Sequence, residues 1–247
     1  MKEEITVAKI VELKNVTKVY KTGEREFRAL DGVDLSIEKG KFVVILGPSG
    51  AGKSTLLNLI GGMDIPTTGQ VIVDGEDISK YNEDKLSRYR AATVGFIFQF
   101  YNILPTLTVL ENVELVKDIV KNPLDAHEAL AKVGLTEHEN KFPNQLSGGE
   151  QQRISIARAV AKNPKVLLCD EPTGALDSEN SHALMAMIQE LHRQGKTIVL
   201  ITHEREIAEY ADRIVLIRDG ILYEEGENAD DTDDTNHKRN SQAMQEA

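Results

Sequence analysis

The sequence predicts an α/β fold built around a parallel sheet, and three observations support this prediction. The first is the apolar run Phe42–Leu46, which ends at a glycine and is followed by helical spacing of leucines in Gly52–Ile60. A short continuous apolar run of this kind is typical of a strand that is buried on both faces. The second is the alternation of apolar runs with longer amphipathic stretches in the second half of the chain. The third is a β-branched opening third that indicates further strands.

The individual elements follow the same patterns. In the opening third, strands are expected at Ile10–Tyr20, Ala29–Glu38 and Gly69–Asp74. Further along the chain, strands are expected at Val94–Phe98, Lys165–Cys169, Thr197–Thr202 and Arg213–Arg218, and helices at Leu107–Asp118, Asp125–Val133, Gly148–Ala161, Ser178–Arg193 and Glu204–Tyr210. Strands that alternate with helices pair in parallel through right-handed crossovers. Such sheets bind their ligands at the carboxyl ends of the strands.

Composition excludes several classes of protein. The formal net charge of −11 argues against nucleic acid as a partner, because phosphate backbones attract basic surfaces. The longest apolar runs are near five residues, whereas a membrane-spanning helix needs about 20. The acidic N-terminus does not resemble a signal peptide, and the single cysteine, Cys169, fits a reducing compartment. We therefore expect a cytoplasmic protein.

One domain is expected over residues 1–225, followed by an acidic tail at residues 226–247. From Glu224 to the last residue there are eight acidic and two basic side chains, a net charge of −6. The segment Ala229–Asn236 has no apolar periodicity, which predicts disorder.

The most specific local motif is the glycine-rich segment Gly47–Thr55, which matches the P-loop pattern G-x-x-x-x-G-K-[ST]. Its glycines let several backbone N–H groups point at one anion, and the helix that follows adds its positive dipole end. Lys53 can reach the β- and γ-phosphates, and the Ser54 hydroxyl can bind Mg²⁺. The expected nucleotide-binding residues of this loop are Gly47, Pro48, Ser49, Gly50, Ala51, Gly52, Lys53, Ser54 and Thr55.

Two adjacent carboxylates, Asp170 and Glu171, follow the apolar run Val166–Cys169. A strand that delivers two carboxylates to its carboxyl end suits a site with a cation, because the two charges repel each other. Asp170 is placed to hold Mg²⁺, and Glu171 to polarise the attacking water. Beside a P-loop, this pair predicts nucleotide hydrolysis.

A second anion-binding device is expected at Ser147, Gly148 and Gly149, at the start of a helix. One nucleotide does not need two such loops from the same subunit. The second loop is therefore predicted to serve a nucleotide on another chain, although a plain helix N-cap would use the same residues.

The P-loop, the Leu146-Ser147-Gly148-Gly149-Glu150 segment and the Asp170-Glu171 pair, in this order, resemble the ATP-binding-cassette ATPases over residues 10–225. The resemblance implies a P-loop NTPase (RecA-like) core of α/β class, with an antiparallel β subdomain and an inserted α-helical subdomain at about residues 100–162. It also implies ATP and Mg²⁺ as cofactors and an ATP-dependent homodimer that holds two nucleotides between its subunits.

The resemblance further assigns roles to single residues. Tyr20 matches the aromatic residue on which adenine stacks. Gln99 matches a glutamine that contacts Mg²⁺ and the attacking water, and His203 matches a histidine at the γ-phosphate. Asp177 matches a loop that touches the partner subunit. Glu171, His203 and Gln99 are thus the expected catalytic residues, and Ser54, Gln99 and Asp170 the expected Mg²⁺ ligands.

Within this family, the chain is similar to the macrolide-exporter (MacB-type) and lipoprotein-release (LolD-type) group. The similarity lies in Glu150–Arg153, Gly174–Asp177 and Phe98–Thr108. Because the chain ends soon after the cassette, a separate transmembrane permease is expected, in some cases with a periplasmic or extracellular adaptor, and the chain is placed on the inner face of the membrane. The alternative is an ATPase that regulates a membrane partner in cell division, similar to the FtsE type.

Overall fold

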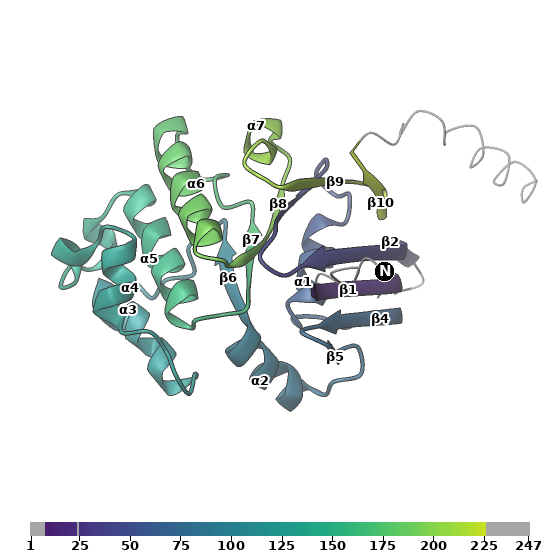
Figure 1. Ribbon diagram of the computed structural model, residues 1–247, viewed down its shortest axis with the longest axis horizontal. Helices are drawn as coiled ribbons and strands as arrows, with labels where there is room; N and C mark the ends of the chain where they lie inside the picture. Colours follow the sequence, from purple (N-terminus) through teal and green to yellow (C-terminus); the bar gives the residue numbers. More distant parts are fainter. Residues whose placement is uncertain (1–7, 24, 226–247) are drawn as a thin grey trace, which may run out of the picture.

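The computed structural model describes residues 8–23 and 25–225, and a mainly parallel sheet forms the centre of the molecule (Figure 1). Its spatial order is β10-β9-β3-β8-β7-β6, with β10 antiparallel to β9 and the other pairs parallel. The strands are β3 (Phe42–Leu46), β6 (Val94–Phe98), β7 (Val166–Asp170), β8 (Thr197–Thr202), β9 (Arg213–Arg218) and β10 (Ile221–Glu224). The loops that follow β3, β8 and β7 therefore leave the same edge of the sheet side by side.

The parallel sheet has a buried hydrophobic cluster on each of its two faces. Phe42 and Val44 belong to one buried cluster, whereas Val43 and Ile45 belong to the other, because successive side chains of a strand point to opposite faces. This double burial explains why β3 is a continuous apolar run, and the parallel-strand prediction is confirmed.

A second, antiparallel sheet has the order β2-β1-β4-β5 and lies at one end of the molecule (Figure 1). It consists of β1 (Lys9–Thr22), β2 (Arg25–Glu38), β4 (Thr68–Val73) and β5 (Glu76–Asp77). Apolar side chains of β1, β2 and β4 share a buried cluster with β3 and with α1 (Lys53–Ile60). The antiparallel sheet is therefore fixed against the helix that follows the P-loop.

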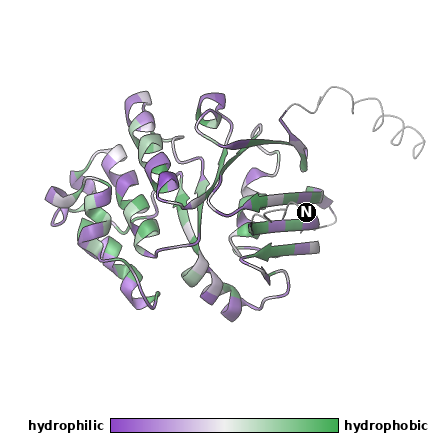
Figure 2. Ribbon diagram, in the orientation of Figure 1, coloured by the Kyte–Doolittle hydropathy of each residue, from purple (hydrophilic) through white to green (hydrophobic). Residues whose placement is uncertain are grey.

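Three helices lie together at the other end of the molecule, beyond β6 (Figure 1). These are α3 (Val109–Glu114), α4 (Ala126–Lys132) and α5 (Gly148–Ala161), accompanied by short 3-10 turns at Leu115–Asp118, Thr136–His138 and Pro143–Gln145. Together with α6 (Ser178–Arg193) they cover the face of the parallel sheet opposite α1. In Figure 2 the strands of the parallel sheet are mainly hydrophobic, whereas these helices alternate between hydrophobic and hydrophilic residues. The predicted fold class, with its antiparallel β part and inserted helices, is confirmed.

Three elements were not predicted: α2 (Glu83–Thr93), β5 and β10. Helix α2 buries only Leu86 and Tyr89, so its apolar pattern is too sparse to recognise. The helix expected at Leu107–Asp118 begins at Val109, because Thr108 caps it in a capping box with Glu111. Its last turn is a 3-10 helix.

The remaining short helix, α7, covers Arg205–Ala208, within the expected Glu204–Tyr210. None of the helices in residues 8–23 and 25–225 combines the length and the apolar character that a bilayer crossing requires. The expected acidic tail, residues 226–247, lies outside the described residues.

Candidate nucleotide-binding and catalytic site

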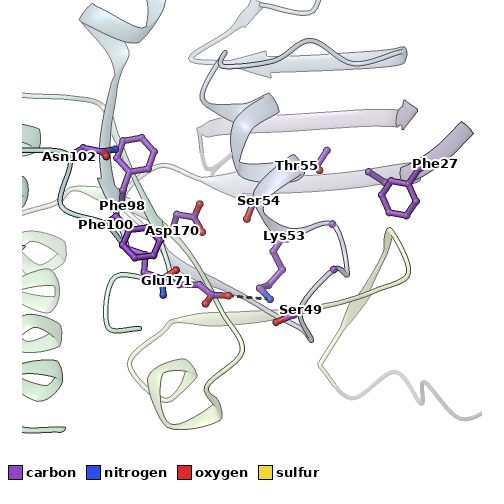
Figure 3. Close-up of a pocket in the computed structure, with 14 residues that line it drawn as sticks. Phe27, Ser49, Lys53, Ser54, Thr55, Phe98, Phe100, Asn102, Asp170 and Glu171 are labelled. Atoms are coloured by element: carbon purple, nitrogen blue, oxygen red, sulfur yellow. Dashed lines mark ion pairs between the residues drawn. The ribbon is translucent and has the colours of Figure 1, made fainter. Parts of the chain in front are cut away.

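A cleft of about 550 Å³ opens at the carboxyl edge of the parallel sheet, where the P-loop faces the end of β7 (Figure 3). Strand β3 delivers the P-loop, β7 delivers the two carboxylates, and β6 delivers Gln99. The cleft is lined by Phe27, Ala29, Ser49, Gly50, Gly52, Lys53, Ser54, Thr55, Phe98, Gln99, Phe100, Asn102, Asp170 and Glu171. Residues separated by more than 100 positions in the sequence thus meet at one edge, as expected for a parallel sheet.

Two glycines of the P-loop, Gly47 and Gly52, are required because neighbouring backbone lies very close. A Cβ on Gly47 would come within 2.3 Å of the carbonyl oxygen of Ile217, and one on Gly52 within 2.5 Å of that of Ala29. Gly52 has a φ of 104° and caps α1 without any side-chain hydrogen bond. The first-turn N–H groups of α1 therefore keep their hydrogen-bonding capacity and face the cleft, which suits an anion.

Lys53 is held at the bottom of the cleft, with only 5% of its side chain exposed. Its Nζ donates hydrogen bonds to the carbonyl oxygens of Gly47 at 2.7 Å and Pro48 at 3.0 Å. It also pairs with Glu171 Oε1 at 3.4 Å, the contact drawn as a dashed line in Figure 3. The lysine ammonium thus sits between the P-loop and the carboxylate expected to polarise water.

The Glu171 carboxylate lies between two basic side chains. While Oε1 faces Lys53, Oε2 is 3.2 Å from Nδ1 of His203, which follows β8. Its backbone has a φ of 43°, a left-handed conformation uncommon for a residue other than glycine, and its N–H donates to the carbonyl of Ile201. Such backbone strain is found most often at functional sites. The structure therefore brings Lys53, Glu171 and His203 together, while the catalytic roles of Glu171 and His203 stay predictions.

Asp170 and Ser54 face each other across the cleft. Burial and the neighbouring Glu171 raise the pKa of Asp170, against the opposing effects of Lys53 and of a hydrogen bond with Ser54. A divalent cation would compensate the buried negative charge of Asp170. The Asp170 carboxylate and the Ser54 hydroxyl therefore fit a Mg²⁺ ion that is also bound by nucleotide phosphates. No cluster of three or more acidic, histidine or cysteine ligands occurs in the described residues. A Mg²⁺ bound here would therefore rely on the nucleotide for part of its coordination.

Gln99 lines the cleft from the end of β6, packed against the loop that follows Glu171. A Cβ on Gly174 would lie 2.8 Å from Gln99 Nε2, so glycine leaves room for the amide. Gln99 thus lines the same cleft as Asp170 and Glu171, while its contact with Mg²⁺ and the attacking water stays a prediction.

Tyr20, the predicted adenine-stacking residue, does not line the cleft. Its hydroxyl donates to Asp64 Oδ2 at 2.9 Å, and the Asp64 carboxylate also pairs with Lys18 at 2.6 Å. Phe27 lines the cleft instead and is 60% exposed. Tyr20 and Phe27 are directly opposite each other in the β1–β2 pair, so their side chains share one face of the sheet. Sequence reasoning missed Phe27, because only the register of the two strands reveals this pairing.

Ser147, Gly148 and Gly149 lie at the start of α5 and do not line the cleft. Ser147 forms a capping box with Glu150: its hydroxyl donates to Glu150 Oε2 at 2.8 Å, and the Glu150 N–H donates to Ser147 Oγ. The N-cap role is therefore realised, while a role toward a nucleotide on another chain stays a prediction.

Asp177 caps α6 next to this segment. It accepts hydrogen bonds from the backbone and side-chain N–H groups of Asn180, and the Asn180 side chain packs on Gly149. The loop expected to touch a partner and the Ser147–Gly149 segment are therefore neighbours on one surface.

Comparison with known proteins shows which family the chain resembles. Residues 30–174 match the family model described as "ABC transporter". The chain is 47% identical over 218 residues to the uncharacterized ABC transporter ATP-binding protein YknY of Bacillus subtilis, covering 86% of this chain and 95% of that protein. It is 44% identical over 228 residues to the macrolide export ATP-binding/permease protein MacB of Chlorobaculum tepidum, covering 90% of this chain. It spans only 35% of the length of that exporter.

Solved structures of ABC cassettes are also similar to this chain. The dimeric cassette MJ0796 of Methanocaldococcus jannaschii superposes with a TM-score of 0.80 at 43% identity, covering 87% of this chain and 98% of that one. A post-hydrolysis dimer of the same cassette, bound to ADP and Pi, gives a TM-score of 0.79 at 42% identity over the same shares of both chains. With the P-loop, the carboxylate pair and the family match in agreement, the chain belongs to the ABC transporter family and is an ATP-binding, ATP-hydrolysing cassette.

Proposed function

We propose that this chain is the ATPase subunit that powers a separate membrane permease, in an exporter similar to the MacB group. The observation that carries the proposal is the meeting of Lys53, Glu171 and His203 at one point of the cleft, in a chain that is similar to macrolide exporters over 90% of its length. The transported substrate would be a drug, a peptide or a lipid-linked molecule. The chain would then work on the inner face of the membrane.

The predicted phosphate-binding and catalytic residues each receive a role in ATP hydrolysis. The P-loop N–H groups and Lys53 bind the β- and γ-phosphates. Glu171 accepts a proton from the attacking water, and His203, 3.2 Å from its carboxylate, fixes the orientation of that carboxylate. Gln99 and Ser54 complete the polar lining at the γ-phosphate.

Mg²⁺ would be held by Ser54, Asp170 and Gln99 together with phosphate oxygens. Bound there, it neutralises the charge that develops on the transferred phosphoryl group. The raised pKa of Asp170 fits this arrangement, because the carboxylate lacks a sufficient counter-charge in the protein itself.

The proposal includes an ATP-dependent homodimer. Ser147–Gly149 lies outside the cleft of its own chain, at the start of α5, where the N–H groups of Gly148 and Gly149 have no partner within the helix. In a head-to-tail dimer this segment would close over the nucleotide of the opposite subunit. Dimeric structures of the similar cassette support this assembly.

A groove of about 340 Å³ supports a membrane partner. It lies where β6 and the loop after α1 meet the inserted helices, and Met63 and Ile119 are exposed at its rim by 53% and 63%. Inside it, Arg158 and Lys162 have only carbonyl oxygens as hydrogen-bond partners among the described residues. An apolar cytoplasmic helix of the permease, carrying a carboxylate, would cover the apolar rim and supply the missing negative charge.

The experiment pairs the Glu171→Gln variant with wild type, each purified with the membrane protein that binds it and reconstituted into liposomes. We expect wild type to hydrolyse ATP faster in the complex than alone. Glu171→Gln is expected to keep ATP binding and the complex but to lose at least 99% of its turnover, because the amide cannot accept a proton (a loss of about 10²- to 10⁴-fold).

Multiple-turnover phosphate release close to wild type would remove Glu171 from the role of general base. A complex whose ATPase is stimulated but that moves no substrate in either direction would favour the regulator of cell division over the exporter. An ATPase rate that is the same with and without the membrane protein would contradict the coupling itself.

A further inference from the structure

Gln152, on the buried side of α5, binds two backbone segments beside the catalytic cleft, at the carboxyl ends of the adjacent strands β6 and β7. Its Nε2 donates one hydrogen bond to the carbonyl oxygen of Phe98 and one to that of Pro172, each at 3.1 Å. Phe98 directly precedes Gln99, and Pro172 directly follows Glu171. One side-chain amide therefore ties α5 to the two backbone segments that position the predicted catalytic residues.

The burial of this amide suggests a role other than stability. Gln152 is fully buried, and its Oε1 has no hydrogen-bond partner among the described residues. The orientation of the amide is fixed, because a flip would turn Oε1 against two carbonyl oxygens. A buried polar atom without a partner costs stability, and an apolar side chain of similar length would avoid that cost. What the site requires from glutamine is its pair of N–H donors.

Helix α5 connects this amide to the segment expected to bind the opposite nucleotide. The helix runs without interruption from Gly148 to Ala161, and Gln152 lies about one turn beyond Gly148. A displacement of the N-terminus of α5 therefore displaces the Gln152 side chain by a similar amount. Its two hydrogen bonds would carry that displacement to the carbonyls of Phe98 and Pro172.

We propose that Gln152 is a positioning residue that couples the two nucleotide sites of the dimer. When Ser147–Gly149 of one subunit engages the nucleotide of the other, α5 shifts, and Gln152 draws the backbone beside Gln99 and Glu171 of its own subunit into the hydrolytic arrangement. Each site then turns over efficiently only when the opposite nucleotide is bound, which is positive cooperativity. This inference rests on the proposed homodimer.

The neighbouring Gln151 provides a matched control. Its Nε2 also donates to two carbonyl oxygens, of Pro143 at 3.0 Å and Leu146 at 3.1 Å. Both acceptors belong to the loop that leads into α5, so Gln151 makes the same kind of contact without reaching the catalytic cleft. The two glutamine side chains make the same type of hydrogen bond, but Gln151 binds the segment before α5 and Gln152 binds the backbone beside the catalytic residues.

The test compares Gln152→Met with Gln151→Met by steady-state ATPase kinetics and thermal unfolding. For Gln152→Met we expect kcat to fall by roughly 10- to 100-fold, because the catalytic groups are misplaced. The KM for ATP should stay within about twofold, and the Hill coefficient should fall from its wild-type value above 1 toward 1. Gln151→Met should keep both the wild-type Hill coefficient and kcat within about threefold. The melting temperature of Gln152→Met should be no lower than that of Gln151→Met.

A second arm measures ATP-dependent dimerisation by size-exclusion chromatography in a Glu171→Gln background, with and without Gln152→Met. The proposal is supported if Glu171→Gln dimerises equally well with and without Gln152→Met, and if the Hill coefficient of the Gln152→Met single variant falls toward 1. An unchanged kcat and Hill coefficient, a wild-type Hill coefficient of 1, or an equal loss in Gln151→Met overturns it and leaves the proposed function standing. If Glu171→Gln itself forms no dimer with ATP, the proposed homodimer is wrong and the inference with it.

Discussion

At the scale of single residues, the site combines predicted chemistry with contacts that the sequence does not reveal. Glu171 was expected to polarise water, and the structure adds that it adopts a φ of 43° between Lys53 and His203. Tyr20 was expected to stack on adenine, but its hydroxyl is bound to Asp64, and its cross-strand neighbour Phe27 lines the cleft beside the P-loop. These two rings give the nucleobase two candidate surfaces.

We expect Phe27→Val to raise the KM for ATP by about 2- to 10-fold and to leave kcat unchanged, because an aromatic contact contributes roughly 0.5–1.5 kcal/mol. Binding of inorganic tripolyphosphate, which has no base, should be the same in Phe27→Val and wild type. Calorimetric titration of both ligands measures this.

Tyr20→Phe is the control for Phe27→Val, since it keeps the ring and removes only the hydroxyl, which bonds to Asp64 and Thr55. An ATP affinity unchanged in Phe27→Val but lowered in Tyr20→Ala would return the stacking role to Tyr20 alone.

At the scale of elements, α5 and α6 are fitted together at their N-termini. Gly149, in the first turn of α5, leaves room for the Asn180 side chain. Asn180 donates hydrogen bonds to Asp177, the N-cap residue of α6. A methyl group on Gly149 would lie 2.4 Å from Asn180 Oδ1. Since Asp177 is expected at a partner interface, this packing determines how two functional segments sit relative to each other.

We expect Gly149→Ala to lower the free energy of unfolding by about 1–3 kcal/mol, because overpacking and loss of the α6 cap outweigh the helix preference of alanine. Urea denaturation of the nucleotide-free protein measures this difference.

Gly148→Ala is the matched change, since the one close contact of its methyl group would be with the hydroxyl end of the Tyr101 side chain, at 2.8 Å. It should change stability by less than about 1 kcal/mol. Equal effects of the two substitutions would show that Asn180 moves aside without cost.

At the scale of the whole molecule, the core and the inserted helices meet along the groove that we assign to the permease. Burial lowers the pKa of Lys162 to about 8, with Arg158 and Arg90 adding to the effect. The positive charges here are thus partly desolvated and close to one another, in a chain whose overall charge is −11. A partner that brings a carboxylate would relieve this repulsion and bring the pKa of Lys162 back up.

We expect Ile119→Arg to abolish stimulation of the ATPase by the membrane partner and to leave the basal rate within about twofold of wild type. The substitution removes apolar contact area and adds a charge that repels the basic groove, while Ile119 is not among the residues of the catalytic cleft. ATPase assays of the reconstituted complex test this. Ile119→Leu, which keeps the apolar rim, should behave as wild type, and full stimulation of Ile119→Arg would place the partner elsewhere.

The sequence by itself determined the nucleotide chemistry and most of the fold. The P-loop, the Asp170–Glu171 pair and the buried strands are recognisable because each is local: a glycine pattern, adjacent charges, or an unbroken apolar run. The sparse helix α2 escaped prediction, because few of its residues are buried and its position depends on packing.

Only the tertiary structure decided which distant residues meet. The strand order places β8 between β3 and β7, so that His203 reaches Glu171, and the β1–β2 register sets Phe27 opposite Tyr20. The two bonds of Gln152 to the backbone beside Gln99 and Glu171 likewise depend on how α5 packs on the sheet. Register and helix packing are set by contacts between segments far apart in the chain, and no local pattern records them.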